Sequence, residues 1–254
     1  MTTLFVGERP TRLGLLYNPH SGTNRRRPTD LPAAVAALDH FASQAVDLVA
    51  ISGGDGTVQM TLTALWSRPA MTLRPQLAVF AAGTTNMTAS DVGHPGDQVW
   101  ALRQLAHWLR TGVGRVARVK RSVLQLAVPG HALQCGMFVG AGLISRGVGF
   151  YREDLHDRGL AGLPGILLTL GRGLGAAARS GARHLLRLLP VLVRGRSHPL
   201  GTEANGYFAG GATEIRLFLD SPLALDGELF TPVSATEPTV VRAAGRAIFL
   251  RVDG

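Results

Sequence analysis

Short apolar runs alternate with amphipathic stretches through the first half of the chain. The runs Leu13–Tyr17, Val46–Ile51 and Leu77–Phe80 have the length of buried strands, and each leads into a polar loop rich in glycine or asparagine. Apolar residues recur at helical spacing in three further stretches, Pro32–Ser43, Thr57–Trp66 and Asp97–Arg110. Strands alternating with helices predict a parallel sheet with helices on its faces.

After about Val116 the pattern changes to short strands separated by turns. The predicted strands are Val119–Val128, Gln134–Val139, Glu214–Leu219, Leu225–Thr231 and Arg246–Val252. Between them, Leu160–Leu192 is apolar, and arginines at near-helical spacing predict one or two amphipathic helices there: Arg172, Arg179, Arg183 and Arg187. We therefore expect an α/β domain over residues 1–117. We expect a β-rich domain over 118–254, with a helical insert at about 153–194.

Composition narrows the choice of partners. The net charge is +9, but Lys120 is the only lysine among 26 basic residues, which indicates a general bias toward arginine. Aromatic residues make up only 6 %, and no nucleic-acid-binding motif is present, so we expect no nucleic-acid partner. A basic surface facing phosphate or anionic lipid agrees with the charge.

The cysteine content and the apolar stretches also predict the cellular compartment. Cys135 is the only cysteine, which excludes an intrachain disulfide and a cysteine-based metal site. Residues 1–10 lack the pattern of a signal peptide, and the apolar stretches are too short to span a bilayer. We expect a cytoplasmic protein that contacts the inner membrane face peripherally.

The loop after the second predicted strand carries the strongest chemical signal. Glycines there let backbone N–H groups approach an anion, and the helix that follows adds the positive end of its dipole. The loop residues are Gly53, Gly54, Asp55, Gly56 and Thr57. The carboxylate of Asp55 would repel a phosphate. It would instead suit a residue that holds a metal or a water network, or one that accepts a proton. The alternative is a tight strand–helix turn with Asp55 as a helix cap.

Two further polar loops follow neighbouring strands. Asn18-Pro19-His20-Ser21-Gly22 follows the first, and Gly83-Thr84-Thr85-Asn86 follows the third. Each could be an ordinary turn. Because parallel strands end at one edge of a sheet, and ligands bind beyond their carboxyl ends, we expect the three loops to converge.

The set Asn18-Pro19-x-Ser21-Gly22, Gly53-Gly54-Asp55-Gly56-Thr57 and Gly83-Thr84-x-Asn86 resembles the motifs of the diacylglycerol kinase catalytic-domain family. That family includes bacterial lipid kinases and sphingosine kinases, and it is more distantly similar to NAD kinases. Leu225-Asp226-Gly227-Glu228 matches the family's Asp-Gly-Glu turn. The resemblance implies an N-terminal α/β domain, a C-terminal β-sandwich, and a nucleotide site in the cleft between them.

The resemblance also implies roles for individual residues in ATP-dependent phosphoryl transfer. Gly53 to Thr57 would cradle the phosphates of ATP, and the rest of the nucleotide site would be Asn18, Pro19, Ser21, Gly22, Thr29, Gly83, Thr84 and Asn86. Glu228 would be the general base, with Asp55 the second choice and Asp226 a support for metal or hydrogen bonding. Mg²⁺ would bridge the phosphates, without an identified set of protein ligands. The alternative for Asp226-Gly227 is a β-hairpin turn.

Three functions stay open. The first is a lipid kinase acting on a hydroxyl of a diacylglycerol-like or sphingoid-like lipid at a membrane surface. The second is a weak or inactive nucleotide- or lipid-binding module, because 34 residues lie between Asn18 and Gly53, where the family places two helices and a further strand. The third is a kinase for a soluble acceptor such as NAD.

Overall fold

The computed structural model describes residues 2–4, 9–18, 31–67, 74–83, 86–94, 97–142, 145, 202–203 and 210–253. The helices are α1 (Leu31–Ser43), α2 (Asp55–Trp66), α3 (Met87–Val92) and α4 (Gln98–Thr111). The strands of the larger sheet are β1 (Thr2–Leu4), β2 (Leu13–Tyr17), β3 (Leu48–Gly53), β4 (Gln76–Ala81), β5 (Arg115–Ala127), β6 (Gln134–Gly136), β8 (Glu214–Leu217) and β11 (Thr239–Asp253). The smaller sheet contains β7 (Val139–Ala141), β9 (Leu223–Leu225) and β10 (Glu228–Phe230).

Three parallel strands form the part of the larger sheet that precedes the polar loops. β3 lies between β2 and β4, with Ile51 opposite Leu16 on one side and Val79 on the other. All six residues of β3 are buried, as expected for a strand with helices on both faces. The predicted α/β arrangement is confirmed.

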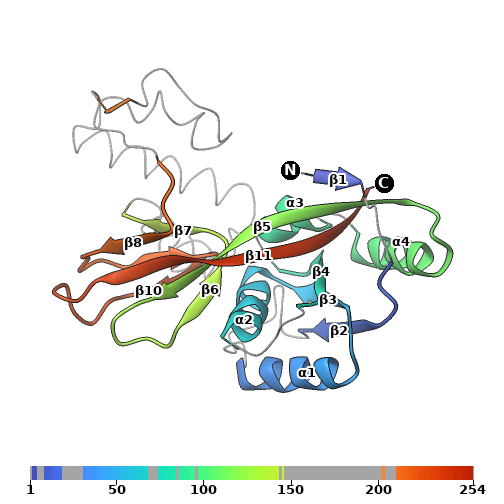
Figure 1. Ribbon diagram of the computed structural model, residues 1–254, viewed down its shortest axis with the longest axis horizontal. Coiled ribbons are helices and arrows are strands. Elements are labelled where there is room, and N and C mark those ends of the chain that lie inside the picture. The colour runs from blue at the N-terminus through green and yellow to red at the C-terminus, as the bar shows by residue number, and fades with distance from the viewer. Residues whose placement is uncertain are drawn as a thin grey trace, which may run out of the picture.

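A long antiparallel pair extends from the parallel strands to the C-terminal part of the chain. β5 pairs with β11 along its whole length, and β11 also lies parallel to β4, where Phe249 faces Leu77. Figure 1 shows β5 and β11 reaching the side of the molecule that holds the smaller sheet. The expected boundary at residues 117 and 118 falls inside β5, so the division there stays a prediction.

Three apolar clusters stabilise this arrangement. α1, α2 and α3 cover one face of the larger sheet, with Leu38, Leu62 and Phe249 inside. α4 covers the other face through Ala101, Leu105 and Trp108. The third cluster joins the far ends of β5 and β11 to β9, in the manner of two packed sheets: it contains Leu126, Val128, Leu223, Leu225 and Val241. This agrees with the expected C-terminal β region.

Helix α2 connects the parallel strands to the C-terminal strands through polar side chains. Thr63 Oγ1 accepts from Cys135 N at 2.9 Å and donates to Cys135 O at 3.2 Å. Gln59 Nε2 donates to Gln134 Oε1 at 2.9 Å, and Trp66 Nε1 donates to Ala244 O at 3.0 Å. Because α2 begins at the glycine loop, these bonds hold that loop in a fixed relation to β6 and β11.

Several local features differ from the predicted pattern. The predicted strand Leu225–Thr231 is divided by a turn between β9 and β10, and the last strand begins at Thr239, earlier than the predicted Arg246. Residues 134–139 form two short strands, β6 and β7, because the chain turns at Met137 and Phe138. The six-residue helix α3 was not predicted, since so short a segment shows no helical period. The apolar stretch 160–192 and its arginines lie outside the described residues. Among the helices that are described, none is long and apolar enough to cross a bilayer.

The role of Thr63 can be tested by substitution with valine, which has nearly the same shape. Thr63→Val removes the partner of Cys135 N in a buried place, so we expect a loss of about 2 kcal/mol in the free energy of unfolding. Thr61→Val is the control, because buried Thr61 bonds only to Thr57 O of its own helix, and we expect less than about 1 kcal/mol. Urea denaturation measures both, and equal losses would contradict this role.

Candidate nucleotide site

The first and second polar loops meet at the carboxyl ends of β2 and β3. Asn18 N donates to Ser52 O at 3.0 Å, which extends the strand pairing by one residue. Asn18 Nδ2 donates to Thr57 Oγ1 at 2.9 Å, and Thr57 is buried in the first turn of α2. The amide of Asn18 therefore holds the start of α2 from the side.

The second and third loops meet through their backbones. A Cβ atom at Gly83 would lie 2.5 Å from Gly54 Cα, and one at Gly54 would lie 3.1 Å from Gly83 Cα. Ala82 N donates to Gly53 O at 3.1 Å. Only glycine permits so close an approach at position 83. The predicted convergence of the three loops is thus observed for their described residues.

Asp55 bridges the glycine loop to α3. Its Oδ1 accepts from Thr88 N at 2.7 Å and its Oδ2 from Met87 N at 3.1 Å, which satisfies two N–H groups in the first turn of α3. Asp55 is therefore a helix cap, but for a neighbouring helix. The N-cap of α2 is Gly54, so no side chain of the cap residue bonds to the first N–H groups of α2, the groups that bind anions at helix N-termini.

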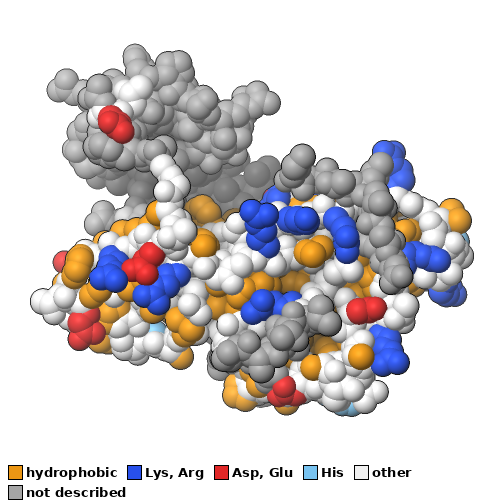
Figure 2. All heavy atoms as spheres, viewed as in Figure 1, with side chains coloured by type: hydrophobic (Ala, Val, Ile, Leu, Met, Phe, Trp, Pro, Cys, Tyr) orange, Lys and Arg blue, Asp and Glu red, His pale blue; other side chains and the backbone are white. Residues whose placement is uncertain are grey.

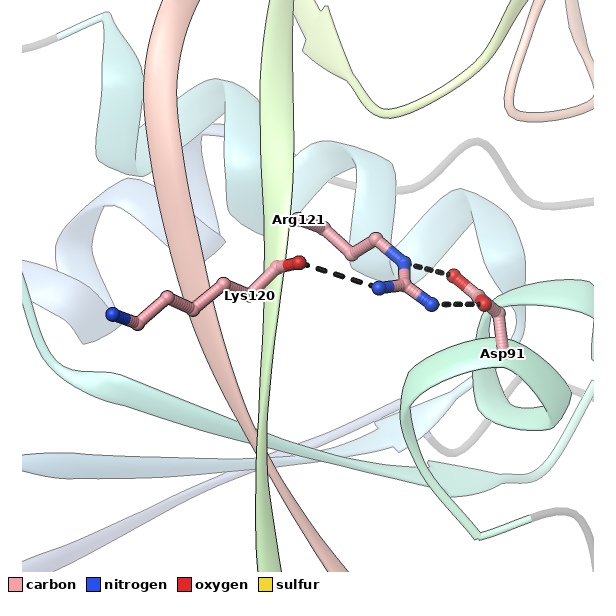
Figure 3. A network of polar contacts seen from close by, with 3 residues as sticks. All are labelled: Asp91, Lys120 and Arg121. Carbon is pink, nitrogen blue, oxygen red and sulfur yellow. Dashed lines mark hydrogen bonds and ion pairs between the residues drawn. The ribbon is translucent and has the colours of Figure 1, made fainter. Parts of the chain in front are cut away.

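Helix α3 is also held at its other end. The carboxylate of Asp91 receives two bonds from Arg121 of β5, at 2.7 and 2.6 Å (Figure 3). This hydrogen-bonded partner lowers the pKa of Asp91 below its ordinary value. Because both ends of α3 are fixed, the two N–H groups that face Asp55 are fixed as well.

Asn86 folds its amide back onto the third loop. It has a left-handed backbone, with φ of 51°, which asparagine tolerates better than most residues. Its Oδ1 accepts from Gly83 N at 2.7 Å, and its Nδ2 donates to Gly83 O at 2.6 Å. In this structure Asn86 therefore shapes the loop.

The Asp226-Gly227 segment is a hairpin turn, as the alternative interpretation predicted. Both residues have positive φ, 47° and 88°, and they connect β9 to β10, where Leu225 faces Glu228. These angles are those of a two-residue turn of type I′. Glu228, the first residue of β10, is half-buried.

Both carboxylate oxygens of Asp226 accept hydrogen bonds from backbone N–H groups. Its Oδ2 accepts from Met137 N at 2.9 Å and its Oδ1 from Phe138 N at 2.8 Å, and the residue is 7 % exposed. The pKa of Asp226 is raised to about 6, mainly by burial and also by the negative charge of Asp55, although the two backbone bonds act to lower it.

Sequence reasoning missed one polar contact of the site. Ser52 Oγ is 2.6 Å from Gln98 Nε2, which donates to it from the first residue of α4, and Ser52 is only 2 % exposed. Ser52 stood out only as a polar residue at the end of an apolar run. Gln98 gave no signal, because nothing in its neighbourhood in the sequence relates it to β3.

Five of the predicted site residues are not among the residues that the structure describes. Pro19, Ser21, Gly22, Thr29 and Thr84 are outside the described residues. Within the part of the chain that is described, no three His, Cys, Asp or Glu side chains gather as metal ligands. The structure therefore joins Asn18, the glycine loop, Gly83 and Asn86 into one site.

The contact between Gly54 and Gly83 is testable by adding one methyl group. In Gly83→Ala the new Cβ meets backbone at 2.5 Å, so we expect a loss of about 1–3 kcal/mol in the free energy of unfolding. Gly211→Ala is the matched control, since a Cβ there would have no atom of the described residues within 4 Å. Thermal or urea unfolding compares the two variants, and equal stability would argue against a close contact.

The raised pKa of Asp226 predicts a pH-dependent stability. A raised folded-state pKa contributes stability that is present below the ordinary value of 3.8 and is lost as the pH rises through about 6. Relative to Asp226→Asn, the wild-type protein should therefore lose about 1–3 kcal/mol between pH 4 and pH 7. Denaturant titrations of both proteins measure this difference. A difference that does not change with pH would contradict burial of an ionisable carboxyl.

Comparison with known proteins gives a family match for part of the chain. Residues 25–116 match the family model described as the diacylglycerol kinase catalytic domain. The Asn18 loop and the Asp226–Glu228 turn lie outside the matched residues. A search of curated proteins finds no match.

Three solved structures from Bacillus anthracis are similar to part of the chain. Two were provisionally assigned as diacylglycerol kinases: one is 22 % identical, with a TM-score of 0.38, and covers 54 % of this chain and 47 % of its own. The other is 21 % identical, with a TM-score of 0.40, and covers 57 % and 58 %. The third, given as a diacylglycerol kinase, is 22 % identical, with a TM-score of 0.40, and covers 58 % of each chain. The similarity thus spans about half the length of these proteins.

The matched residues include the glycine loop, the third loop and all four helices. The resemblance to the diacylglycerol kinase catalytic-domain family is therefore confirmed over residues 25–116.

Proposed function

We propose that this chain is an ATP-dependent lipid kinase, which transfers the γ-phosphoryl group of ATP to a hydroxyl of a diacylglycerol-like or sphingoid-like lipid. One observation carries the proposal: helix α2 begins at the glycine loop without a side-chain cap, at the place where the first and third loops contact that loop. The matched catalytic domain supports it, because the match includes the glycine loop and α2.

In this proposal the N-terminus of α2 receives the phosphates of ATP. The N–H groups of Asp55 and Gly56 precede the first bond within the helix, which Thr57 N donates to Gly54 O at 3.0 Å, and Gly54 places no side chain beside them. Asn18 holds Thr57 at the same end of the helix. The loop would therefore bind phosphate through backbone that is already in place before the nucleotide arrives.

The proposed base is Glu228, with Asp55 and Asp226 as positioning residues. Asp55 and Asp226 each use both carboxylate oxygens to accept backbone N–H groups, which suits holding loops together. Glu228 follows the Asp226 turn directly. The lipid oxygen would bond to the γ-phosphorus, the bond to the ADP oxygen would break, and Glu228 would take the hydroxyl proton.

The proposal includes Mg²⁺, which would be bound mainly by the phosphates of ATP. Such ions in kinases keep several waters and bind mainly phosphate oxygens, and they neutralise charge in the transition state. Because the described residues contain no cluster of three metal-ligating side chains, the proposal assigns Mg²⁺ no protein ligand. A cytoplasmic location remains part of the proposal.

A second candidate is a binding module without turnover. The double occupation of Asp55 and of Asp226 by backbone donors favours it, because those carboxylates then serve the fold. Such a module would bind ATP at the same loop. It would show heat of binding in calorimetry but no phosphate transfer to any lipid.

The kinase proposal predicts a specific pattern of lost activity. With labelled ATP and a panel of lipids, with NAD as the soluble acceptor, we expect Glu228→Gln to lower the transfer rate by about 10²–10⁴-fold, as for loss of a general base. Asp55→Asn should lower the rate by about 10²-fold, since it displaces the loop from α3. The expected acceptor is a lipid.

The same substitutions at exposed acidic residues serve as controls. Glu237→Gln and Asp220→Asn remove the same groups from exposed positions in the C-terminal part, and both should keep full activity. Circular dichroism checks that each variant is folded. Full activity of both site variants would rule out the proposed roles, and transfer to NAD alone would rule out the lipid.

A further inference from the structure

One edge of the larger sheet exposes an apolar row. In the described part of the chain, β2 pairs with β3 alone, at the edge of the sheet. Leu13, Leu15 and Tyr17 lie on the face that α4 covers over β3 and β4, yet they are 47 %, 52 % and 65 % exposed. Gly14 faces the opposite way, against Phe41 of α1. The exposed row therefore belongs to one side of the strand.

Helix α4 runs alongside this row. Near its start, Gln98 bonds to Ser52, which lies opposite Tyr17 in the register. Near its end, Leu109 and Arg110 share an open hollow of about 870 Å³ with Leu13. The exposed row of β2 and the outer side of α4 thus form one surface, which we name the α4–β2 face.

The charged residues of this face are mostly basic. Arg103, His107 and Arg110 are exposed on α4, and Arg9 and Arg12 line the hollow. No aspartate or glutamate occurs between Asp97 and Glu153. Among the described residues, Asp47 is an acid that contacts the lining of the hollow, and its carboxylate accepts from Thr11 N and Arg12 N.

The basic character continues beyond α4 on the same side of the sheet. Lys120 of β5 faces Ile248 in the register, two residues from the Arg118–Leu250 pair, and Leu250 packs under α4. Figure 3 shows Lys120 extending away from Arg121 and Asp91. In Figure 2, Lys and Arg side chains gather over β5 and at the α4 end of the molecule.

Large apolar side chains are interspersed with these charges. Val99 and Trp100 in the first turn of α4 are 56 % and 44 % exposed, and Val113 after the helix is 66 % exposed. Basic residues mixed with exposed Trp, Leu and Tyr are the composition of surfaces that lie in a membrane interface. A row of this kind is costly to leave in water.

We propose that the α4–β2 face docks on an anionic lipid bilayer. The positive charge of the face favours a bilayer over a second copy of the chain as the binding partner. Symmetric pairing of the face would bring its arginines close to those of the partner, and like charges at an interface oppose binding. Anionic headgroups would instead be complementary to them, and each basic residue near such a surface favours binding.

Docking in this way would bring the bilayer to the candidate site. Tyr17, at the end of the exposed row, directly precedes Asn18, and α4 contacts the site through Gln98 and Ser52. The choice of a bilayer as the anionic partner rests on the proposed lipid-kinase function. Vesicle binding without ATP, however, is measured independently of any phosphate transfer.

The test is flotation of the full chain with vesicles of phosphatidylcholine, with and without phosphatidylglycerol. We expect binding only to the anionic vesicles, weakened by salt. The double variant Arg103→Gln/Arg110→Gln should lower the partition coefficient by about tenfold. Leu15→Ser should lower it severalfold. The matched control is Arg216→Gln/Arg242→Gln, which removes equal charge from exposed residues of β8 and β11 and should change it by less than about twofold.

Three outcomes would overturn the inference. The first is equal loss in both double variants, which would mean that net charge alone matters. The second is equal binding to neutral vesicles, or none to either kind. The third is a dimer, seen by light scattering, that Leu15→Ser dissociates while vesicle binding is unchanged. Matching thermal melts of the variants exclude unfolding as the cause of any loss.

Discussion

The candidate site depends on one constraint, the close backbone contact between Gly54 and Gly83, together with the bonds from the Asp55 carboxylate to α3. The two backbones approach closely enough to exclude a side chain at position 83, and Asp55 then reaches the first N–H groups of α3. Two strand ends and two helix starts are fixed together in this way. The same contact leaves the start of α2 without a side-chain cap, which is the property a phosphate site needs.

Helix α2 carries this constraint into the rest of the molecule. Its buried side chains Gln59 and Thr63 bond to β6, and Trp66 bonds to the backbone of β11. Asp226 completes the connection, since it ties the β9–β10 turn to the link between β6 and β7 and responds to the charge of Asp55. A shift of the glycine loop would therefore be transmitted to the C-terminal sheet through fixed polar contacts.

Sequence reasoning reached the three parallel strands, the long helices and the meeting of the loops, because hydrophobic period and parallel-strand geometry determine them. It assigned Asp55 to catalysis or to a cap of its own helix, and the structure shows a cap of α3, a helix too short to predict. It did not predict that β11 pairs with β4 as well as with β5, because these are contacts between residues far apart in the sequence. Gln98 and the turn at Met137 likewise depend on tertiary contacts that carry no local pattern.

The central claim is that the glycine loop and the start of α2 bind the phosphates of ATP. Hydrogen–deuterium exchange with and without ATP and Mg²⁺ tests it most directly, because it reports backbone N–H groups. The account predicts slower exchange in peptides that cover residues 53–58 and 83–88 when ATP is present. Unchanged exchange in both, or protection confined to the hollow at residues 9–13 and 106–110, would contradict it.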